Sequence, residues 1–436
     1  MKNKEYRLLT LLLILLLKIF LYTQDSLYLS LPDEIYLSSD IQFSIYFNNL
    51  ISGILPDKYS FEVSCNVGYR DSIRYNLDSL NEGSYEIEIH IKDSLGQITE
   101  CDSSMVFVSD HTIDPNDTLK VLVIGDSYTN AGVYLKHLKD IYNSSTNNPI
   151  KFMGTNYNVG YPYYGIDNEL FHEGYWGKTW DWFANNLSSP FIFEEEEGLD
   201  ISRYFYESLD KETPDIIIIF LGINDLAYAD PTTVETIDNW IDYKILNDST
   251  SGKLIDSICA VFPNSQIGIA LTPPVNVREY TYTDTTQLDY FERKKCHHRL
   301  CQRYIDYFKT RNNSNISIIP INVNIDTFSG FGETDPLHPV ISGYRQIAFT
   351  IYGWIKYNIQ LIKTRPAGLE ISFQESQVDL NWDNVEGAEL FRIYRSINPF
   401  GDFIKIGTSL TPNYIDHDIS LSKKYFYRVT SENSLK

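Results

Sequence analysis

The sequence predicts an α/β domain built on a parallel β-sheet of five strands, with a small all-β sandwich domain on each side of it. Three observations lead to this prediction. Short strands of alternating apolar and polar residues fill residues 26–110 and 366–436, and apolar strands alternate with helical stretches over residues 119–362. The length, 436 residues, is too great for one ordinary hydrophobic core.

Residues 1–22 resemble an export signal. Three basic residues precede the apolar run 8–17, and Lys18 interrupts that run. A stable transmembrane helix needs an uninterrupted apolar span of about 20 residues, so we expect a cleaved signal peptide rather than an uncleaved anchor. The protein is then secreted, or lies in the periplasm or at the cell surface, without stable membrane association.

The charge of the chain excludes one class of partner. Its 58 acidic residues outnumber its 36 basic residues, which gives a formal net charge of −22. Such a surface repels nucleic acids and anionic membranes. We therefore expect no nucleic-acid partner and a neutral substrate.

The first β-rich region, residues 26–110, predicts an antiparallel, immunoglobulin-like sandwich. Its alternating runs, such as "IQFSIYF" and "SYEIEIHIKD", are separated by turn residues. Cys65 and Cys101 both lie here, and an exported protein could pair them. The sequence leaves that disulfide open.

The central region, residues 119–362, has the rhythm of a parallel sheet covered by helices on both faces. The predicted strands are residues 119–125, 150–155, 214–222, 266–274 and 316–321, and the predicted helices include residues 131–142, 232–245, 290–309 and 342–362. Active sites in such sheets lie beyond the carboxyl ends of the strands. That edge is where we look for reactive side chains.

The last region, residues 366–436, resembles a fibronectin type III module. A tryptophan, Trp382, lies in an early strand, and a strand rich in tyrosine follows near the end of the sequence. The last strand of such a sandwich is missing or very short, so we expect an exposed edge or a truncated sequence.

The stretch "KKCHHRLCQRY", residues 294–304, has the composition of a metal cluster. Its spacing fits no zinc pattern, and on a helix Cys296 and Cys301 are five residues apart and diverge. We interpret the stretch as a solvated helix face, and we predict no metal site there.

Four short motifs end at or near the predicted strand termini. In order they are "GDSYT", "HEGYWGKTW", "LGIND" and "DPLHP", which begin at residues 125, 172, 221 and 335. Each motif alone is more often a turn or a helix cap. All four at one edge of a parallel sheet indicate an active site.

These motifs contain the groups that acyl transfer needs. Ser127 is the candidate nucleophile, His338 the base that accepts its proton, and Asp335 the carboxylate that orients the imidazole. The oxyanion needs preorganised donors. The N–H groups of Ser127 and Gly177 and the side-chain amide of Asn224 are the candidates.

The four motifs resemble those of the SGNH hydrolases, the GDSL esterase family, over residues 119–360. The resemblance assigns the catalytic roles to Ser127, His338 and Asp335 and the oxyanion hole to Ser127, Gly177 and Asn224, with Gly174 as a fallback for the glycine. It implies a flavodoxin-like three-layer α/β/α fold, an open site and no cofactor. Tyr128 stands where the family usually has leucine.

The substrate is predicted from the aromatic residues of segment 152–183. Flat aromatic faces beside an open site suit sugar rings, and Trp176 and Tyr175 are the candidate substrate contacts. We therefore expect hydrolysis of short-chain esters, with O-acetyl groups on a polysaccharide or oligosaccharide as the substrate. The alternatives are a lipid-ester or thioester hydrolase, a glycan O-acyltransferase, and a carbohydrate-binding protein without catalytic activity.

Overall fold

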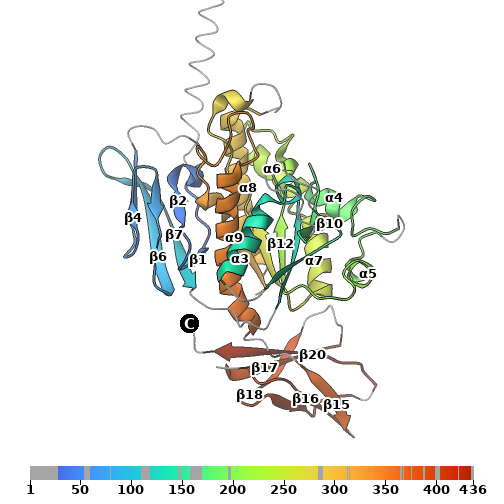
Figure 1. Ribbon diagram of the computed structural model, residues 1–436. Coiled ribbons are helices and arrows are strands. Elements are labelled where there is room, and N and C mark those ends of the chain that lie inside the picture. The colour runs from blue at the N-terminus through green and yellow to red at the C-terminus, as the bar shows by residue number, and fades with distance from the viewer. Residues whose placement is uncertain are drawn as a thin grey trace, which may run out of the picture.

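The structure of the chain, a computed structural model, describes residues 28–433 except for 54–58, 79, 110–117, 146–148, 158–168, 195–197, 283–287, 312, 314, 364–365, 367, 375, 386–387, 398–402 and 421 (Figure 1). The predicted signal peptide, residues 1–22, lies outside the described residues. Within the described ranges, no helix is both long and apolar enough to cross a membrane.

The N-terminal β-rich region consists of two sheets around a shared core. One sheet has the order β1-β7-β6-β3 and the other the order β2-β5-β4. Their strands are β1 (Glu34–Ser38), β2 (Ser44–Tyr46), β3 (Ser60–Ser64), β4 (Tyr69–Arg70), β5 (Arg74–Asn76), β6 (Gly83–Lys92) and β7 (Ile98–Ser109). β1 pairs with β7 in parallel, so the sandwich is not wholly antiparallel.

The central sheet follows the order β10-β11-β8-β12-β13-β14, and β9 also pairs with β8. Its strands are β8 (Leu119–Gly125), β9 (Ile150–Met153), β10 (Asn156–Tyr157), β11 (Phe171–Gly174), β12 (Ile216–Phe220), β13 (Gln266–Ala270) and β14 (Ile316–Ile319). Only the pairing of β10 with β11 is antiparallel. The first three residues of "HEGYWGKTW" belong to strand β11, which pairs with the end of β8.

Helices cover both faces of this sheet. One face packs against α2 (Ser127–Asn130), α3 (Val133–Ser145) and α9 (Ile341–Lys363). The other packs against α4 (Trp180–Asn185), α5 (Ile201–Glu207), α6 (Val234–Lys244), α7 (Ser251–Val261) and α8 (Tyr290–Thr310). The mixed α/β content and the parallel sheet are confirmed, and the finer flavodoxin-like arrangement stays a prediction. The predicted number of five strands is wrong, because the described residues form a sheet of seven, to which β10 and β11 add an edge.

The N-terminal sandwich packs directly on the α/β domain, beside α9 (Figure 1). The Asn49 side chain donates hydrogen bonds to the carbonyls of Asn322 and Ile325 at 2.9 and 2.7 Å. The N–H of Ser44 donates to Asn324 Oδ1 at 2.9 Å. These polar contacts fix the sandwich against the 3-10 turn that follows β14.

Helix α8 corrects one prediction. Its stretch from residue 293 to 298 is buried rather than solvated. The His297 ring lies 2.7 Å from the carbonyl of Thr272, and the His298 ring lies 3.2 Å from the carbonyl of Leu50. The N-terminal sandwich covers part of this polar helix face, where Asn48 contacts Lys294 and the Leu50 carbonyl contacts His298.

The C-terminal region also forms two sheets, β15-β16-β19 and β18-β17-β20. The strands are β15 (Glu370–Gln374), β16 (Gln377–Asn381), β17 (Ala388–Ser396), β18 (Ile404–Ser409), β19 (Asn413–Asp416) and β20 (Phe426–Asn433). Trp382 packs on Phe391 in its core, with ring centroids 5.3 Å apart. Arg395 and Tyr427 both contact the buried carboxylate of Asp416, which ties the two sheets together.

Cys65 and Cys101 are free cysteines. Cys65 packs against the core between the two N-terminal sheets. The sulfur of Cys101 instead lies 3.1 Å from Glu88 on the exposed side of the sheet. The structure therefore answers the open disulfide question with two separate thiols.

Candidate active site

The nucleophile candidate follows the central strand directly. β8 ends at Gly125, Asp126 caps the short helix α2, and Ser127 is the first residue of that helix. A Cβ atom on Gly125 would lie 2.0 Å from Thr129 Oγ1, so this position needs glycine for space. The φ of Gly125 is not among the positive values, so space rather than backbone conformation is the reason for glycine here.

The loop before α9 brings His338 to the serine. The His338 ring places Nε2 2.9 Å from Ser127 Oγ and Nδ1 2.9 Å from Asp335 Oδ2. The other oxygen of Asp335 accepts the backbone N–H groups of Leu337 and His338, both at 2.8 Å. Asp335 therefore fixes its own loop and the imidazole at the same time.

Asp335 and His338 each favour the charged form of the other. Burial by itself would lower the pKa of His338, but the hydrogen bond to Asp335 and its charge outweigh burial, so the pKa of His338 is raised. Burial would likewise raise the pKa of Asp335, but its contact with His338 outweighs burial and lowers that pKa. A proton taken from Ser127 thus finds a base that is stabilised in its charged form.

Gly177 lies in the turn between β11 and α4. Its φ of +69° is in the left-handed region, and a Cβ atom there would meet open space. The fallback, Gly174, is less suited to an oxyanion hole, because its N–H already donates to His172 Nδ1 at 3.0 Å. The geometry favours Gly177 as the glycine donor.

Asn224 lies in the 3-10 turn that follows β12. Its side-chain amide donates to Asp126 Oδ2 at 3.2 Å and to the carbonyl of Lys178 at 3.1 Å. Both contacts orient the amide beside the nucleophile turn and the glycine turn. To stabilise an oxyanion, the amide must exchange one of these acceptors for the substrate oxygen.

Two buried carboxylates support these turns, and the sequence prediction did not include either of them. Asp225 accepts the N–H of Trp180, at 3.3 Å, at the start of α4, and burial raises the pKa of Asp225 to about 8. Glu173 accepts hydrogen bonds from Thr155, Tyr175 and Tyr204, and burial raises its pKa. Their position within the predicted motifs was the only signal, since all of their partners except Tyr175 are distant in sequence.

The two predicted substrate contacts differ in their placement. Trp176 is 55 % exposed, and its ring centroid lies 6.0 Å from that of His338. Tyr175 turns its hydroxyl inward to Glu173, at 2.7 Å, and packs against Trp182. Trp176 is therefore the aromatic side chain at the open rim of the site.

A groove of about 1330 Å³ with both polar and apolar walls lies next to two of the predicted catalytic residues. Asp335 and His338 line one part of it, and both the α/β domain and the N-terminal sandwich supply its walls. The polar walls include Asp40, Gln42 and Arg74 from the sandwich and Asp326, Arg345 and Gln346 from the α/β domain. Asp335 and His338 thus border a groove whose polar side chains, from both domains, can hydrogen-bond to an extended hydrophilic substrate.

Comparison with known proteins gives one strong match. The model of the GDSL-like Lipase/Acylhydrolase family matches residues 121–351, more than half of the chain. No curated protein matches the chain.

Several solved structures are similar in fold, at low identity. A lipase/acylhydrolase from Enterococcus faecalis is 16 % identical, with 55 % of this chain and 97 % of that chain covered and a TM-score of 0.32. A peptidoglycan O-acetylesterase is 10 % identical, with 56 % and 92 % covered and a TM-score of 0.31. An Fn3-like protein from Clostridium thermocellum is 26 % identical, with 16 % and 76 % covered and a TM-score of 0.16. Because these TM-scores are low, we base nothing further on them.

Proposed function

Because the chain belongs to the GDSL-like lipase/acylhydrolase family and is therefore an ester hydrolase, we propose that it is an exported serine esterase that removes acetyl groups from a polysaccharide or oligosaccharide. The observation that supports the serine mechanism most directly is the hydrogen-bonded chain from Ser127 through His338 to Asp335. Export remains a proposal from the sequence of residues 1–22.

The proposed mechanism has two steps. Ser127 attacks the ester carbonyl while His338 accepts its proton, and Asp335 stabilises the imidazolium that forms. The N–H groups of Ser127 and Gly177 and the amide of Asn224 hold the oxyanion. His338 then protonates the leaving sugar oxygen, which departs as a hydroxyl. A water molecule, deprotonated by His338, attacks the acyl-enzyme and releases acetate, and His338 returns the proton to the oxygen of Ser127.

The groove supports the choice of a glycan. Its walls present both hydrogen-bond donors, such as Arg345 and Gln42, and acceptors, such as Asp40 and Asp326. A sugar chain offers hydroxyl groups that can pair with both kinds of group. A long acyl chain would instead displace water from these polar side chains without offering hydrogen bonds in return, which costs free energy. A polar leaving group therefore fits the groove better than a lipid.

The position of Trp176 supports the same substrate class. Its exposed ring lies beside His338, where a flat apolar surface can stack on the sugar ring that carries the ester. The small acetyl group needs no apolar tunnel, and the walls of the groove include both polar and apolar side chains. The two predicted features, a sugar platform and a short acyl group, are thus compatible at one site.

The experiment is a comparison of ester substrates with the mature protein and with Ser127→Ala prepared in parallel. We expect turnover of 4-nitrophenyl acetate well above that of 4-nitrophenyl octanoate, and release of acetate from an O-acetylated oligosaccharide. Ser127→Ala should lose about 10³-fold or more in kcat. Activity retained in that variant would refute the serine mechanism.

Other outcomes separate the alternatives. A preference for octanoate would indicate a lipid-ester or thioester hydrolase. Transfer of acetyl to an added glycan, in place of acetate release, would indicate an O-acyltransferase, since water and a sugar hydroxyl compete for the same acyl-enzyme. Absence of turnover together with glycan binding would indicate a carbohydrate-binding protein.

A further inference from the structure

A second group of reactive side chains lies on the exposed side of the N-terminal sandwich, on β6 and β7. Glu88 and His90 are two residues apart on β6, so the alternation of a strand places both side chains on one face. Cys101 lies directly opposite His90 in the register of β6 with β7. Three potential metal ligands therefore meet on one face of two neighbouring strands.

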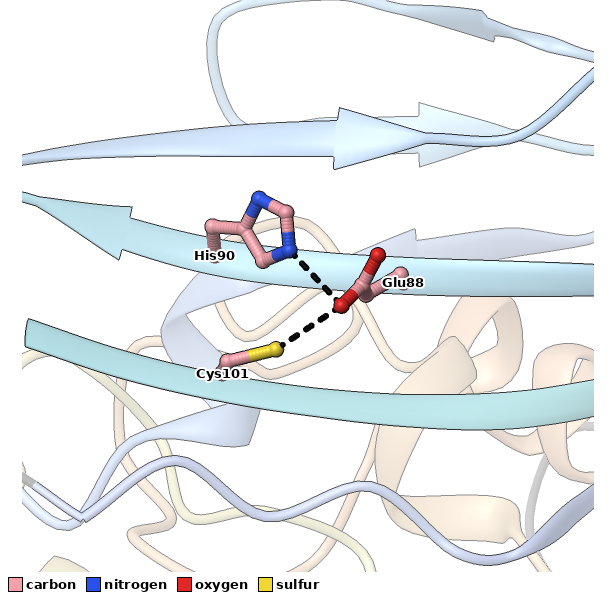
Figure 2. A group of neighbouring side chains, drawn as sticks. All are labelled: Glu88, His90 and Cys101. Atoms are coloured by element: carbon pink, nitrogen blue, oxygen red, sulfur yellow. Dashed lines mark hydrogen bonds and ion pairs between the residues drawn. The ribbon is translucent and has the colours of Figure 1, made fainter. Parts of the chain in front are cut away.

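The three side chains already point toward one another (Figure 2). Glu88 Oε1 lies 3.0 Å from His90 Nε2 and 3.1 Å from Cys101 Sγ. The three ligand atoms all lie within 4.8 Å of one another. The same carboxylate oxygen of Glu88 thus contacts both His90 and Cys101. A cation placed between the three side chains would be within reach of all of them.

We propose that Glu88, His90 and Cys101 form a site for a divalent transition-metal ion, with Zn²⁺ as the ligand that fits best. Carboxylate, imidazole and thiolate are the three ligand types that Zn²⁺ accepts, and the thiolate disfavours Mg²⁺ and Ca²⁺. This site is independent of the esterase chemistry, because it lies on the sandwich and contains none of the groove residues.

The spacing of the ligand atoms suits that ion. With Zn–S of about 2.3 Å and Zn–N and Zn–O of about 2.0 Å, tetrahedral angles separate the ligand atoms by roughly 3.3–3.6 Å. The two contacts in the structure are shorter than this by only a few tenths of an ångström. The third separation, between the ligand atoms of His90 and Cys101, is within 4.8 Å, so side-chain rotations must widen the first two separations and set the third to the same range.

No neighbouring carboxylate among the described residues is placed to fill the fourth coordination position of the ion, so water can occupy it. Glu62 lies opposite His90 on β3, but its carboxylate pairs with Lys92. The Glu88 side chain is 45 % exposed and that of His90 is 12 % exposed. An ion can therefore enter from solvent and keep one water molecule. When neutral His90 ligates through Nε2, binding releases one proton, from the Cys101 thiol.

The test uses Co²⁺ as a spectroscopic stand-in for Zn²⁺, with the mature full chain under reducing conditions. We expect one Co²⁺ per chain, a thiolate-to-cobalt charge-transfer band, and loss of that band when one equivalent of Zn²⁺ is added. Cys101→Ser should abolish the band. His90→Ala and Glu88→Gln should each weaken binding at least about tenfold, because loss of even a supporting group around a metal costs that much.

The matched control is Glu86→Gln, because Glu86 is exposed on the same face of β6 and outside the cluster. It should leave the affinity for Co²⁺ unchanged. Zn²⁺ should also slow the reaction of Cys101 with a thiol reagent, and 4-nitrophenyl acetate turnover reports whether each variant remains folded. Equal Co²⁺ spectra for the unmodified protein and Cys101→Ser, or absence of Co²⁺ binding, would overturn the proposal.

Discussion

The hydroxyl of Tyr128 donates a hydrogen bond to the backbone carbonyl of Leu337 at 3.0 Å, across 209 positions of sequence. Tyr128 follows the proposed nucleophile Ser127, and Leu337 precedes the proposed base His338. The Tyr128 ring also lies 5.6 Å from the His338 ring and 5.4 Å from that of Phe220. A residue that departs from the usual leucine of the family thus connects the two halves of the proposed catalytic pair.

Removing that hydrogen bond should reduce the rate without removing the nucleophile. We expect Tyr128→Phe to lower kcat for 4-nitrophenyl acetate about fivefold, because a buried hydrogen bond contributes about 1 kcal/mol and the loop of His338 loosens without it. KM should change little. Steady-state kinetics checks this, and Tyr134→Phe is the control, because Tyr134 is equally buried and its hydroxyl contacts Thr129 instead. Equal rates for Tyr128→Phe and the unmodified protein would contradict the positioning role.

The raised pKa of His338 predicts the pH dependence of the esterase. A protonated imidazole cannot accept the Ser127 proton, so kcat/KM should fall as the pH falls through the pKa of His338. Because Asp335 raises that pKa, the acid limb should lie above about 6.5, the ordinary histidine value. A profile of kcat/KM from acid to neutral pH gives the midpoint.

Asp335→Asn should shift that limb in a defined direction. Without the carboxylate, burial dominates and lowers the pKa of His338, so the midpoint should move to lower pH. The plateau should also fall by about 10²–10⁴-fold, because the imidazolium loses its partner. Asp40→Asn, in the groove but away from His338, should keep both the midpoint and the plateau. A midpoint that stays in place in Asp335→Asn would contradict the electrostatic role.

The glycine of the oxyanion hole can be tested with a matched pair of substitutions. Gly177 and Gly198 have φ values of +69° and +68°, and at both positions a Cβ atom would meet open space. Alanine should therefore cost each position about 1–2 kcal/mol of stability through backbone strain alone. Only Gly177→Ala should also lower kcat, by about tenfold or more, because the strained turn displaces the N–H donor. Thermal unfolding and kinetics separate the two effects, and equal activity in both variants would exclude Gly177.

The sequence was sufficient for the predictions that depend on neighbouring residues. Each predicted site motif is a few residues long and lies next to a strand end, as for Ser127, Asn224 and the pair Asp335 and His338. The residues that flank each one in sequence were therefore enough to identify it. The parallel sheet followed in the same way from the apolar strands that precede these motifs. The cap by Asp126 is local in the same sense, since its side chain accepts the N–H of Tyr128, two residues later, at 3.0 Å.

The contacts that the sequence did not predict are those between distant segments. Helix α8 reads as a solvated face, and it is buried because the N-terminal sandwich brings Asn48 and Leu50 to Lys294 and His298. Glu173 reads as one acidic residue among many until Tyr204 and Thr155 fold onto it. The sequence shows that a side chain is charged, but it does not show which distant residue will pair with it after folding.

The last prediction concerns the groove. Its walls come from both the sandwich and the α/β domain, so a glycan bound there contacts both of them. Gln42 and Arg345 line it from the two sides, and both side chains are exposed. Gln42→Ala and Arg345→Ala should each lower kcat/KM for an O-acetylated oligosaccharide about fivefold, through loss of one hydrogen bond. Neither should affect 4-nitrophenyl acetate, which is too small to reach them. Gln97→Ala, on the sandwich outside the groove, is the control. Equal losses on both substrates would indicate a disturbed fold, and no loss on the oligosaccharide would place the sugar chain elsewhere, along Trp176.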